Sequence, residues 1–384
     1  MRKTLITIGL IIICLYAVFH FYLRERYFDI LHTSVSPSEF SSDIQGVEEM
    51  LKWYVNTYHI PAVSAAVIDN GKVVKYISTG SLSKANKSSV DENSIYRIAS
   101  TGKMMIAIIA RQLDDEGVID LNQSINFYLE DELQQEAKSK LKSIKLRNLL
   151  LHNSGLGRDW HAFSKEDIIN ALNNNELDFQ TGEKWAYSNF GYALLTTILE
   201  KATGLNYAEL LQKYISHKFQ ISQISATLNE GYKDKYVTPY FPEFKLLKGE
   251  DIDYGQQTLT SGIYTNIKSL SALMIQQIEA YQAEDSIKNI SPLVLNKEKI
   301  NSWSERSFYG YGIFEHHFEL KDFPGIKQTI LEHSGDADGF ACHYGFFPNH
   351  GFGLVVLSSS GGKWFSNMTR NMNALLIREH QRID

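Results

Sequence analysis

The stretch Ser100-Thr101-Gly102-Lys103 places a hydroxyl and an amine three residues apart. It lies where an extended segment is predicted to pass into an apolar helix that runs to about Gly117. Positions i and i+3 share one face of a helix, so Lys103 can approach the Ser100 hydroxyl and assist its deprotonation. The spacing therefore predicts an acylating serine paired with a lysine.

The spacing alone is a weak signal, because short motifs recur by chance. The chain holds three other pairs with this spacing, which are Ser81/Lys84, Ser139/Lys142 and Ser360/Lys363. Only the pair Ser100/Lys103 meets two conditions. It opens an apolar helix after a pair of predicted strands, and it precedes the two motifs described next. Position in the chain therefore singles out this pair.

The second motif is Tyr187-Ser188-Asn189. A phenol held near a lysine ammonium can have a depressed pKa and act as a base, and the Asn189 amide can bind both Lys103 and a substrate amide. The same spacing occurs at Tyr54/Asn56 and Tyr264/Asn266, where a packed aromatic is the ordinary interpretation. Tyr187 is thus a candidate base only in combination with the serine and lysine.

The third motif is His333-Ser334-Gly335, at the end of a predicted strand. A small hydroxyl and a glycine on an edge strand allow a substrate backbone to approach closely, and the N–H of the next residue can point into the site. The alternative interpretation is a turn that ends the strand. The three residues are candidate substrate-binding groups.

Composition sets outer limits on function. The 384 residues are 43% hydrophobic and 21% charged, which is ordinary for a globular protein with one large domain or two. The net charge of −6 without a basic stripe argues against a nucleic-acid partner and favours a small molecule or peptide. The two cysteines, Cys14 and Cys342, provide no disulfide framework.

The N-terminus has the pattern of a membrane segment. An apolar run from about Leu5 to Leu23 follows Arg2 and Lys3, and its ~19 residues match a bilayer core. No small-x-small cleavage site closely follows the run, which favours an uncleaved signal-anchor over a cleaved signal. We therefore predict an anchor and short stem in residues 1–40 and a catalytic domain in residues 41–384.

The remaining chain predicts an α+β fold. Strands near both ends are expected to share one antiparallel sheet flanked by helices, with a mainly helical insertion at about residues 118–300. Asn70-Gly71 suits the turn of the first hairpin. The other expected elements are helices at Ile44–Tyr58 and about Trp364–His380, and strands at Val63–Ile68, Val73–Ile77, Ile326–Leu331, Phe340–Phe347 and Phe352–Leu357.

The order of the motifs and their surroundings resemble the serine β-lactamase and penicillin-binding-protein-like family, in particular its branch of class C β-lactamases, DD-carboxypeptidases and esterases. The resemblance covers about residues 45–380. The stretches that carry it are Tyr96-Arg97-Ile98-Ala99-Ser100-Thr101-Gly102-Lys103, Asp115-Glu116-Gly117-Val118-Ile119-Asp120-Leu121, Leu149-Leu150-Leu151-His152-Asn153-Ser154-Gly155-Leu156, Thr181-Gly182-Glu183-Lys184-Trp185-Ala186-Tyr187-Ser188-Asn189 and His333-Ser334-Gly335.

The resemblance implies a β-lactamase/transpeptidase-like fold and a role for each motif residue. Ser100 would be the nucleophile, Lys103 would lower its pKa and relay a proton, and Tyr187 would be the general base. Asn189 would orient Lys103 and the substrate. The backbone N–H groups of Ser100 and Asp336 would form the oxyanion hole, and no metal or cofactor would be required.

One departure from the family pattern bears on the substrate. Many β-lactamases have a lysine where this chain has His333, and an imidazole titrating near neutrality would hold a substrate carboxylate more weakly. This favours a DD-carboxypeptidase or D-aminopeptidase-like peptidase, or an esterase, with a β-lactamase as the alternative. A non-catalytic sensor or scaffold that binds cell-wall fragments is the alternative from another class.

The expected partners are a small peptide, ester or β-lactam substrate, and a membrane through the N-terminal helix. The resemblance and the anchor together place the chain in a bacterial inner or cytoplasmic membrane, with a single pass and an extracytoplasmic catalytic domain. The remaining histidines, including His316 and His317, are interpreted as surface or packing residues.

Overall fold

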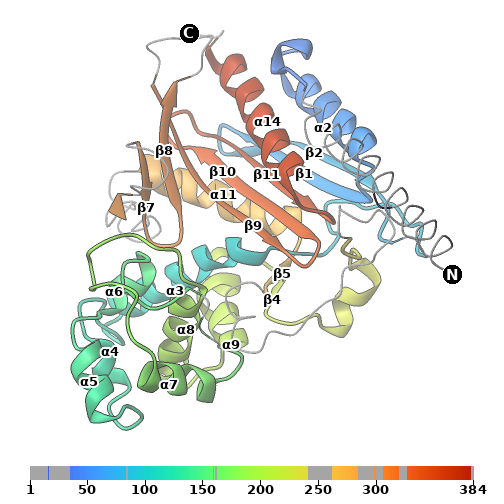
Figure 1. The fold of residues 1–384 in the computed structure, drawn as a ribbon. Coiled ribbons are helices and arrows are strands. Elements are labelled where there is room, and N and C mark those ends of the chain that lie inside the picture. Colours follow the sequence, from blue (N-terminus) through green and yellow to red (C-terminus); the bar gives the residue numbers. More distant parts are fainter. Residues whose placement is uncertain are drawn as a thin grey trace, which may run out of the picture. The chain divides into compact units, whose positions relative to one another are not determined.

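The main sheet of the computed structural model is built from strands near both ends of the chain (Figure 1). The strands are β1 (Ala62–Asp69), β2 (Lys72–Gly80), β6 (Glu298–Lys299), β7 (Ser307–Tyr309), β8 (Phe314–Glu319), β9 (Lys327–Ala337), β10 (Phe340–Phe347) and β11 (Phe352–Ser358). Their order is β2-β1-β11-β10-β9-β8-β7-β6, with antiparallel pairing throughout. The pairing of β1 with β11 joins the two ends, so the predicted α+β fold with a shared antiparallel sheet is confirmed.

The structure describes residue 16 and residues 35–381, apart from residues 84, 159, 161, 241–261, 284–297, 300–305 and 320–326. The predicted membrane segment, Leu5–Leu23, lies outside the described residues except for Tyr16. None of the helices described is both long enough and apolar enough to cross a membrane.

The first hairpin forms as its turn sequence predicts. Asn70 and Gly71 connect β1 to β2 with φ angles of 47° and 70°. Both values lie in the left-handed region that a type I′ turn requires, and asparagine and glycine enter that region with little strain. Ala66 of β1 faces Val355 of β11 on its other side. The hairpin therefore places β1 inside the sheet.

Contacts divide the chain into two units, of which one contains residues 1–59 and 362–384. Its described elements are η1 (Pro37–Glu39), α2 (Ile44–Tyr58) and α14 (Lys363–Gln381), so both predicted terminal helices are confirmed. The rings of Tyr58 and Trp364 stack with centroids 5.8 Å apart. The Asn371 amide donates to the Val35 carbonyl at 3.0 Å and to the Tyr54 hydroxyl at 3.1 Å. These contacts join α2 to α14.

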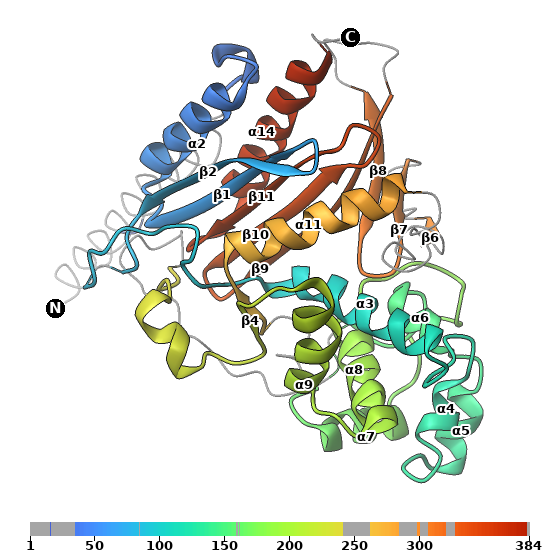
Figure 2. The ribbon, with the colours of Figure 1, turned by 180° about the vertical axis from the view of Figure 1, so that it is seen from behind.

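The second unit, residues 60–361, contains the sheet and a group of helices. One helix, α11, packs on β1, β10 and β11 (Figure 2). Another, α8, contacts α3, α4, α6, α7 and α9, and its residues 190–199 are all buried. The helices are α3 (Gly102–Asp115), α4 (Ile125–Tyr128), α5 (Gln135–Leu141), α6 (Leu146–Leu150), α7 (Lys165–Asn174), α8 (Asn189–Thr203), α9 (Tyr207–Leu211), η3 (Gln212–His217), η4 (Glu230–Lys235) and α11 (Ile267–Gln282).

The segment between β2 and β6 also holds three very short strands. They form a separate sheet in the order β3-β5-β4, with bounds β3 (Tyr96–Arg97), β4 (Ile224–Ser225) and β5 (Tyr264–Thr265). Since β3 directly precedes the Ser100 turn, this small sheet fixes where the turn begins.

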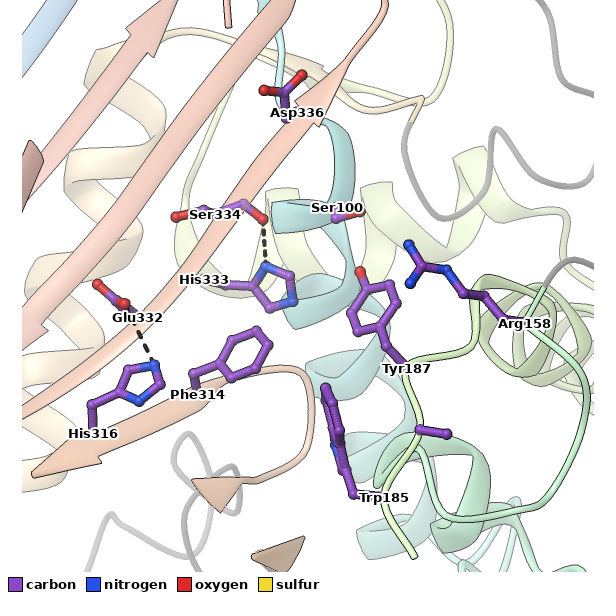
Figure 3. Close-up of a pocket in the computed structure, with 11 residues that line it drawn as sticks. Ser100, Arg158, Trp185, Tyr187, Phe314, His316, Glu332, His333, Ser334 and Asp336 are labelled. Carbon is purple, nitrogen blue, oxygen red and sulfur yellow. Dashed lines mark hydrogen bonds and ion pairs between the residues drawn. The ribbon is translucent and has the colours of Figure 1, made fainter. Parts of the chain in front are cut away.

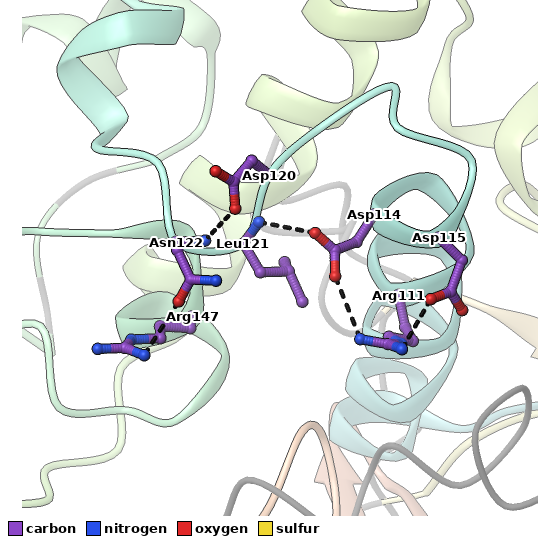
Figure 4. A network of polar contacts seen from close by, with 7 residues as sticks. All are labelled: Arg111, Asp114, Asp115, Asp120, Leu121, Asn122 and Arg147. Atoms are coloured by element: carbon purple, nitrogen blue, oxygen red, sulfur yellow. Dashed lines mark hydrogen bonds and ion pairs between the residues drawn. The ribbon is translucent and has the colours of Figure 1, made fainter.

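A polar network closes the turn after α3 (Figure 4). Arg111 contacts the carboxylates of Asp114 at 3.2 Å and Asp115 at 2.7 Å. The other Asp114 oxygen accepts from the Leu121 N–H at 3.0 Å. Gly117 has a φ of 71°, which a glycine adopts without a steric penalty. The helix that carries Lys103 therefore ends in a well-defined turn.

Candidate active site

Ser100 lies in a tight turn, η2 (Ala99–Thr101), which leads directly into α3. Ala99 has a φ of 48°, a left-handed conformation that is strained for a residue with a Cβ. The Lys103 Nζ lies 3.1 Å from the Ser100 Oγ, and the Lys103 side chain is fully buried. The structure thus brings together the predicted pair.

Gly335 allows strand β9 to pass against this turn. A Cβ at Gly335 would lie 2.1 Å from the carbonyl oxygen of Ile98 and 3.1 Å from the Cβ of Ala99. The Thr101 hydroxyl also lies 3.5 Å from the carbonyl oxygen of His333. The sequence-based interpretation, in which Gly335 admits a substrate backbone, is therefore corrected: it admits the turn that carries the nucleophile.

The third motif was predicted at the end of an edge strand, and this is also corrected. β9 extends to Ala337 and lies between β8 and β10. Its pairing with β8 ends where Phe314 faces Glu332, so within the described chain residues 333–337 are not paired to β8. Ser334 and Asp336 lie on this part of β9 and line one cavity with Ser100. The strand acts as an edge only locally, next to the nucleophile.

Tyr187 lies beside Lys103 but does not have the predicted depressed pKa. The Lys103 Nζ is 4.9 Å from the centroid of the Tyr187 ring. Burial raises the pKa of Tyr187 above its usual value, and the hydrogen bond with Ser100 and the charge of Arg158 offset this only in part. At neutral pH, Tyr187 is therefore a phenol that can donate a hydrogen bond and pass on a proton.

Lys103 has the pKa of a usable base. Burial, followed by the positive charge of Arg158, lowers the pKa of Lys103 to about 7. Near neutral pH a large fraction of the amine is therefore unprotonated and can accept a proton from the Ser100 hydroxyl. Burial thus leaves Lys103, and not Tyr187, with a pKa near neutral pH.

His333 is a buried, neutral imidazole. Its Nδ1–H donates to the Ser334 carbonyl at 2.8 Å, and the Tyr309 hydroxyl donates to its Nε2 at 3.3 Å. Burial, together with the charge of Lys103, lowers the pKa of His333 to about 3. The expectation that this residue titrates near neutrality is therefore wrong, and it brings no positive charge to a substrate carboxylate at pH 7.

Asn189 is a predicted site residue that makes no hydrogen bond to the Ser100–Lys103 pair within the described residues. It is the first residue of α8, whose N-terminus is capped by Ser188 through a 3.0 Å hydrogen bond from the Gly191 N–H. No hydrogen bond joins Asn189 to Lys103 within the described residues, and Asn189 is not among those that line the cavity. Its predicted role in orienting Lys103 is not seen in this geometry.

The cavity has a volume of about 620 Å³, in the range of small-molecule sites. It is lined by five predicted residues, namely Ser100, Tyr187, His333, Ser334 and Asp336 (Figure 3). Sequence reasoning missed six others, which are Arg158, Trp185, Ala186, Phe314, His316 and Glu332. Two of the six, Trp185 and Ala186, directly precede Tyr187 in a stretch quoted above. Their place next to that motif could have indicated that they line the site. His316, which was interpreted as a surface or packing residue, lies in the cavity wall.

His152 belongs to a quoted stretch, but no role was predicted for it. It is buried, and its Nδ1 accepts a hydrogen bond from the Ser188 N–H at 3.1 Å. Its ring centroid lies 4.3 Å from that of Tyr187. Burial, with the charge of Lys103 next, lowers the pKa of His152 well below its usual value. A neutral His152 therefore supports Tyr187 by packing and by holding the adjacent backbone.

The fold and this serine–lysine–tyrosine arrangement define a class, the serine hydrolases with a β-lactamase/transpeptidase fold. A family model described as "Beta-lactamase" matches residues 47–379, so the chain belongs to the β-lactamase family. No group of three or more histidine, cysteine, aspartate or glutamate side chains in the described residues is arranged to hold a metal ion.

Two relatives are similar to this chain over most of its length. Protein flp of Staphylococcus aureus (strain MRSA252) is 22% identical over 361 residues, which cover 88% of this chain and 67% of that protein. Penicillin-binding protein 4* of Bacillus subtilis (strain 168) is 25% identical over 313 residues, which cover 76% of this chain and 66% of that protein. Each match spans about two thirds of the relative's length.

Proposed function

We propose that this chain is a membrane-anchored serine hydrolase that cleaves an amide or ester through an acyl-enzyme, as a DD-carboxypeptidase-like or D-aminopeptidase-like peptidase or as an esterase. The observation that carries the proposal is the 3.1 Å contact between Ser100 Oγ and a buried Lys103 amine with a lowered pKa, at the wall of a cavity. The similarity to penicillin-binding protein 4* supports it.

The reaction follows from the positions of these groups. Unprotonated Lys103 takes the hydroxyl proton as Ser100 Oγ adds to the substrate carbonyl, and the N–H groups of Ser100 and Asp336 stabilise the oxyanion. The leaving group departs with a proton from Lys103, passed on by the Tyr187 phenol. Water then adds to the acyl-enzyme as Lys103 accepts its proton, and that proton returns to Ser100 Oγ as the acid product leaves.

A membrane anchor and an extracytoplasmic site are parts of the same proposal. They are supported by the apolar run Leu5–Leu23 between basic residues. In a bacterial host, the full chain should fractionate with the cytoplasmic membrane, and its catalytic domain should be digested by protease added outside. A chain that is found in the soluble fraction would contradict the anchor.

A substrate panel ranks the possible activities. Hydrolysis of a peptide ending in D-Ala-D-Ala, a short-chain 4-nitrophenyl ester and a chromogenic cephalosporin is measured for the wild type and for Ser100→Ala. We expect Ser100-dependent hydrolysis of the peptide or the ester to exceed that of the cephalosporin. For the uncharged ester the reason is that neutral His333 supplies no cation on β9 for the carboxylate of a lactam. Dominant cephalosporin turnover would overturn the preference, and the absence of any turnover would favour the sensor.

The pH dependence of the reaction reports which group is the base. Because the pKa of Lys103 is lowered to about 7, its unprotonated form increases above that pH, and kcat/KM for a neutral ester should rise through pH 7 to a plateau. A phenolate base would instead give a rise well above pH 9, since the pKa of Tyr187 is raised. Tyr187→Phe should lower the rate and leave the apparent pKa near 7. If the rise in kcat/KM near pH 7 were lost in that variant, the group that titrates there would be Tyr187 and not Lys103.

A further inference from the structure

We infer that Arg158 anchors a carboxylate of the substrate. The inference rests on the proposed function, because it concerns the substrate of the same serine. It assigns an anion-binding role to a residue on the loop that follows His152, across the cavity from the third motif. The substrate class is therefore an ester or amide that carries a carboxylate near its scissile bond.

The charged residues of the cavity favour binding of an anion on the side of Arg158. Arg158 is the one arginine or lysine among the described residues that line the cavity. Two acids, Glu332 and Asp336, lie on the β9 wall. His316 lies 3.5 Å from Glu332, and burial is the main reason why the pKa of His316 is lowered to about 4 and that of His333 to about 3. At pH 7 neither His333 nor His316 therefore brings a positive charge to a carboxylate.

Arg158 is placed where a bound anion would lie beside the nucleophile. Figure 3 shows its guanidinium turned toward Tyr187 and Ser100, on the side of Tyr187 away from His333. Its positive charge contributes to the lowered pKa of Lys103 and opposes the rise in the pKa of Tyr187. A guanidinium can bind a carboxylate through two parallel hydrogen bonds, which also fixes its orientation.

The loop that carries Arg158 is held in place by hydrogen bonds to the segment that carries Tyr187. The Asn153 carbonyl accepts from the Gly182 N–H at 2.8 Å, and the Gly155 carbonyl accepts from the Asp178 N–H at 2.8 Å. The Ser154 carbonyl accepts from the Thr181 hydroxyl at 3.1 Å. The backbone of residues 153–155 is thus joined to residues 178–182, which provides a fixed support for an anchor.

Gly157, the residue before Arg158, is held by a hydrogen bond to the Tyr187 segment and by close packing against Trp160. The Gly157 carbonyl accepts from the Ser188 hydroxyl at 3.5 Å, next to Tyr187. A Cβ at Gly157 would lie 1.9 Å from the indole Nε1 of Trp160, so the chain turns tightly against that ring. These contacts bring the start of the Arg158 side chain to a defined position relative to Tyr187.

The test compares esters that differ by one carboxylate. One pair is 4-nitrophenyl hydrogen adipate and 4-nitrophenyl hexanoate, with the charge in the acyl group. The other is 3-(butyryloxy)benzoate and phenyl butyrate, with the charge in the leaving group. Values of kcat/KM are measured at pH 8.5, where Lys103 is mostly unprotonated, for the wild type, Arg158→Gln, Arg158→Lys and the control Lys184→Gln. Lys184 lies over the ring of Phe179 and is not among the cavity residues.

In at least one pair, the wild type and Lys184→Gln should prefer the charged ester by about 10- to 100-fold, as a charge-assisted hydrogen bond implies. Arg158→Gln should abolish the preference, and Arg158→Lys should keep part of it. The pair that responds shows on which side of the scissile bond the carboxylate lies. Ester hydrolysis without a charge preference, or a preference that survives in Arg158→Gln, overturns the inference alone. No Ser100-dependent hydrolysis of any ester overturns the proposed function and the inference with it.

Discussion

Replacement of Lys103 with methionine is expected to slow acylation about 10²- to 10⁴-fold, the usual contribution of a general base. The Lys103 amine lies 3.1 Å from Ser100 Oγ, and its pKa is lowered to about 7 mainly by burial. Methionine has a similar length and fills the same buried space, but it cannot accept the proton. The measurement is the second-order rate constant for labelling of Ser100 by a fluorophosphonate.

The same substitution should not reduce stability. Since the folded-state pKa of Lys103 lies below the ~10.4 of an unfolded lysine, folding at neutral pH requires part of the protein to release a proton. That penalty applies below pH 10.4 and fades as pH rises toward it, and methionine avoids it. We expect an equal or higher midpoint of thermal unfolding at pH 7. Labelling at the wild-type rate by folded Lys103→Met would contradict the role of Lys103.

Gly335→Ala should lower activity about 100-fold through a steric effect. The new Cβ would lie 2.1 Å from the Ile98 carbonyl oxygen, and relief requires a shift of about 1 Å between β9 and the turn that holds Ser100. A displacement of that size can reduce a rate about 10²-fold. The shift also separates the N–H groups of Ser100 and Asp336, which are proposed to bind the oxyanion. Ester kinetics and thermal unfolding are measured together.

Gly191→Ala is the matched control. A Cβ at Gly191, in α8, would meet the Ser188 side chain at 3.5 Å, which is an ordinary contact. The variant should keep near-wild-type activity although Gly191 lies close to Tyr187 in the chain. If Gly335→Ala were as active as Gly191→Ala, the close passage of β9 against the nucleophile turn would not be needed for catalysis.

Local sequence patterns predicted much of the fold and the centre of the site. Asn70-Gly71 specified the hairpin, because few residue pairs tolerate two successive positive φ angles. Helical periodicity located α2, α3 and α14, and the i, i+3 spacing brought Lys103 to Ser100. In each case, the residues that give the pattern are the same residues that form the structure, or lie within a few positions of them.

The failed expectations depend on burial and on contacts between distant segments. His333 and Tyr187 have shifted pKa values mainly because the fold reduces their contact with water, which spacing along the chain does not show. Arg158 and Glu332 reach the cavity from a loop and a strand that lie far apart in sequence. The local edge of β9 arises because its pairing with β8 ends at Glu332. A single sequence provides no register between strands.

Mass spectrometry of the labelled protein shows whether Ser100 is an acylating nucleophile. The folded full chain is treated with a fluorophosphonate and, in parallel, with a fluorescent penicillin, and the modified peptide is sequenced. We expect one adduct per chain with at least one probe, located on Ser100 and absent from Ser100→Ala. No adduct with either probe on folded protein, or an adduct on another residue that persists in Ser100→Ala, would contradict it.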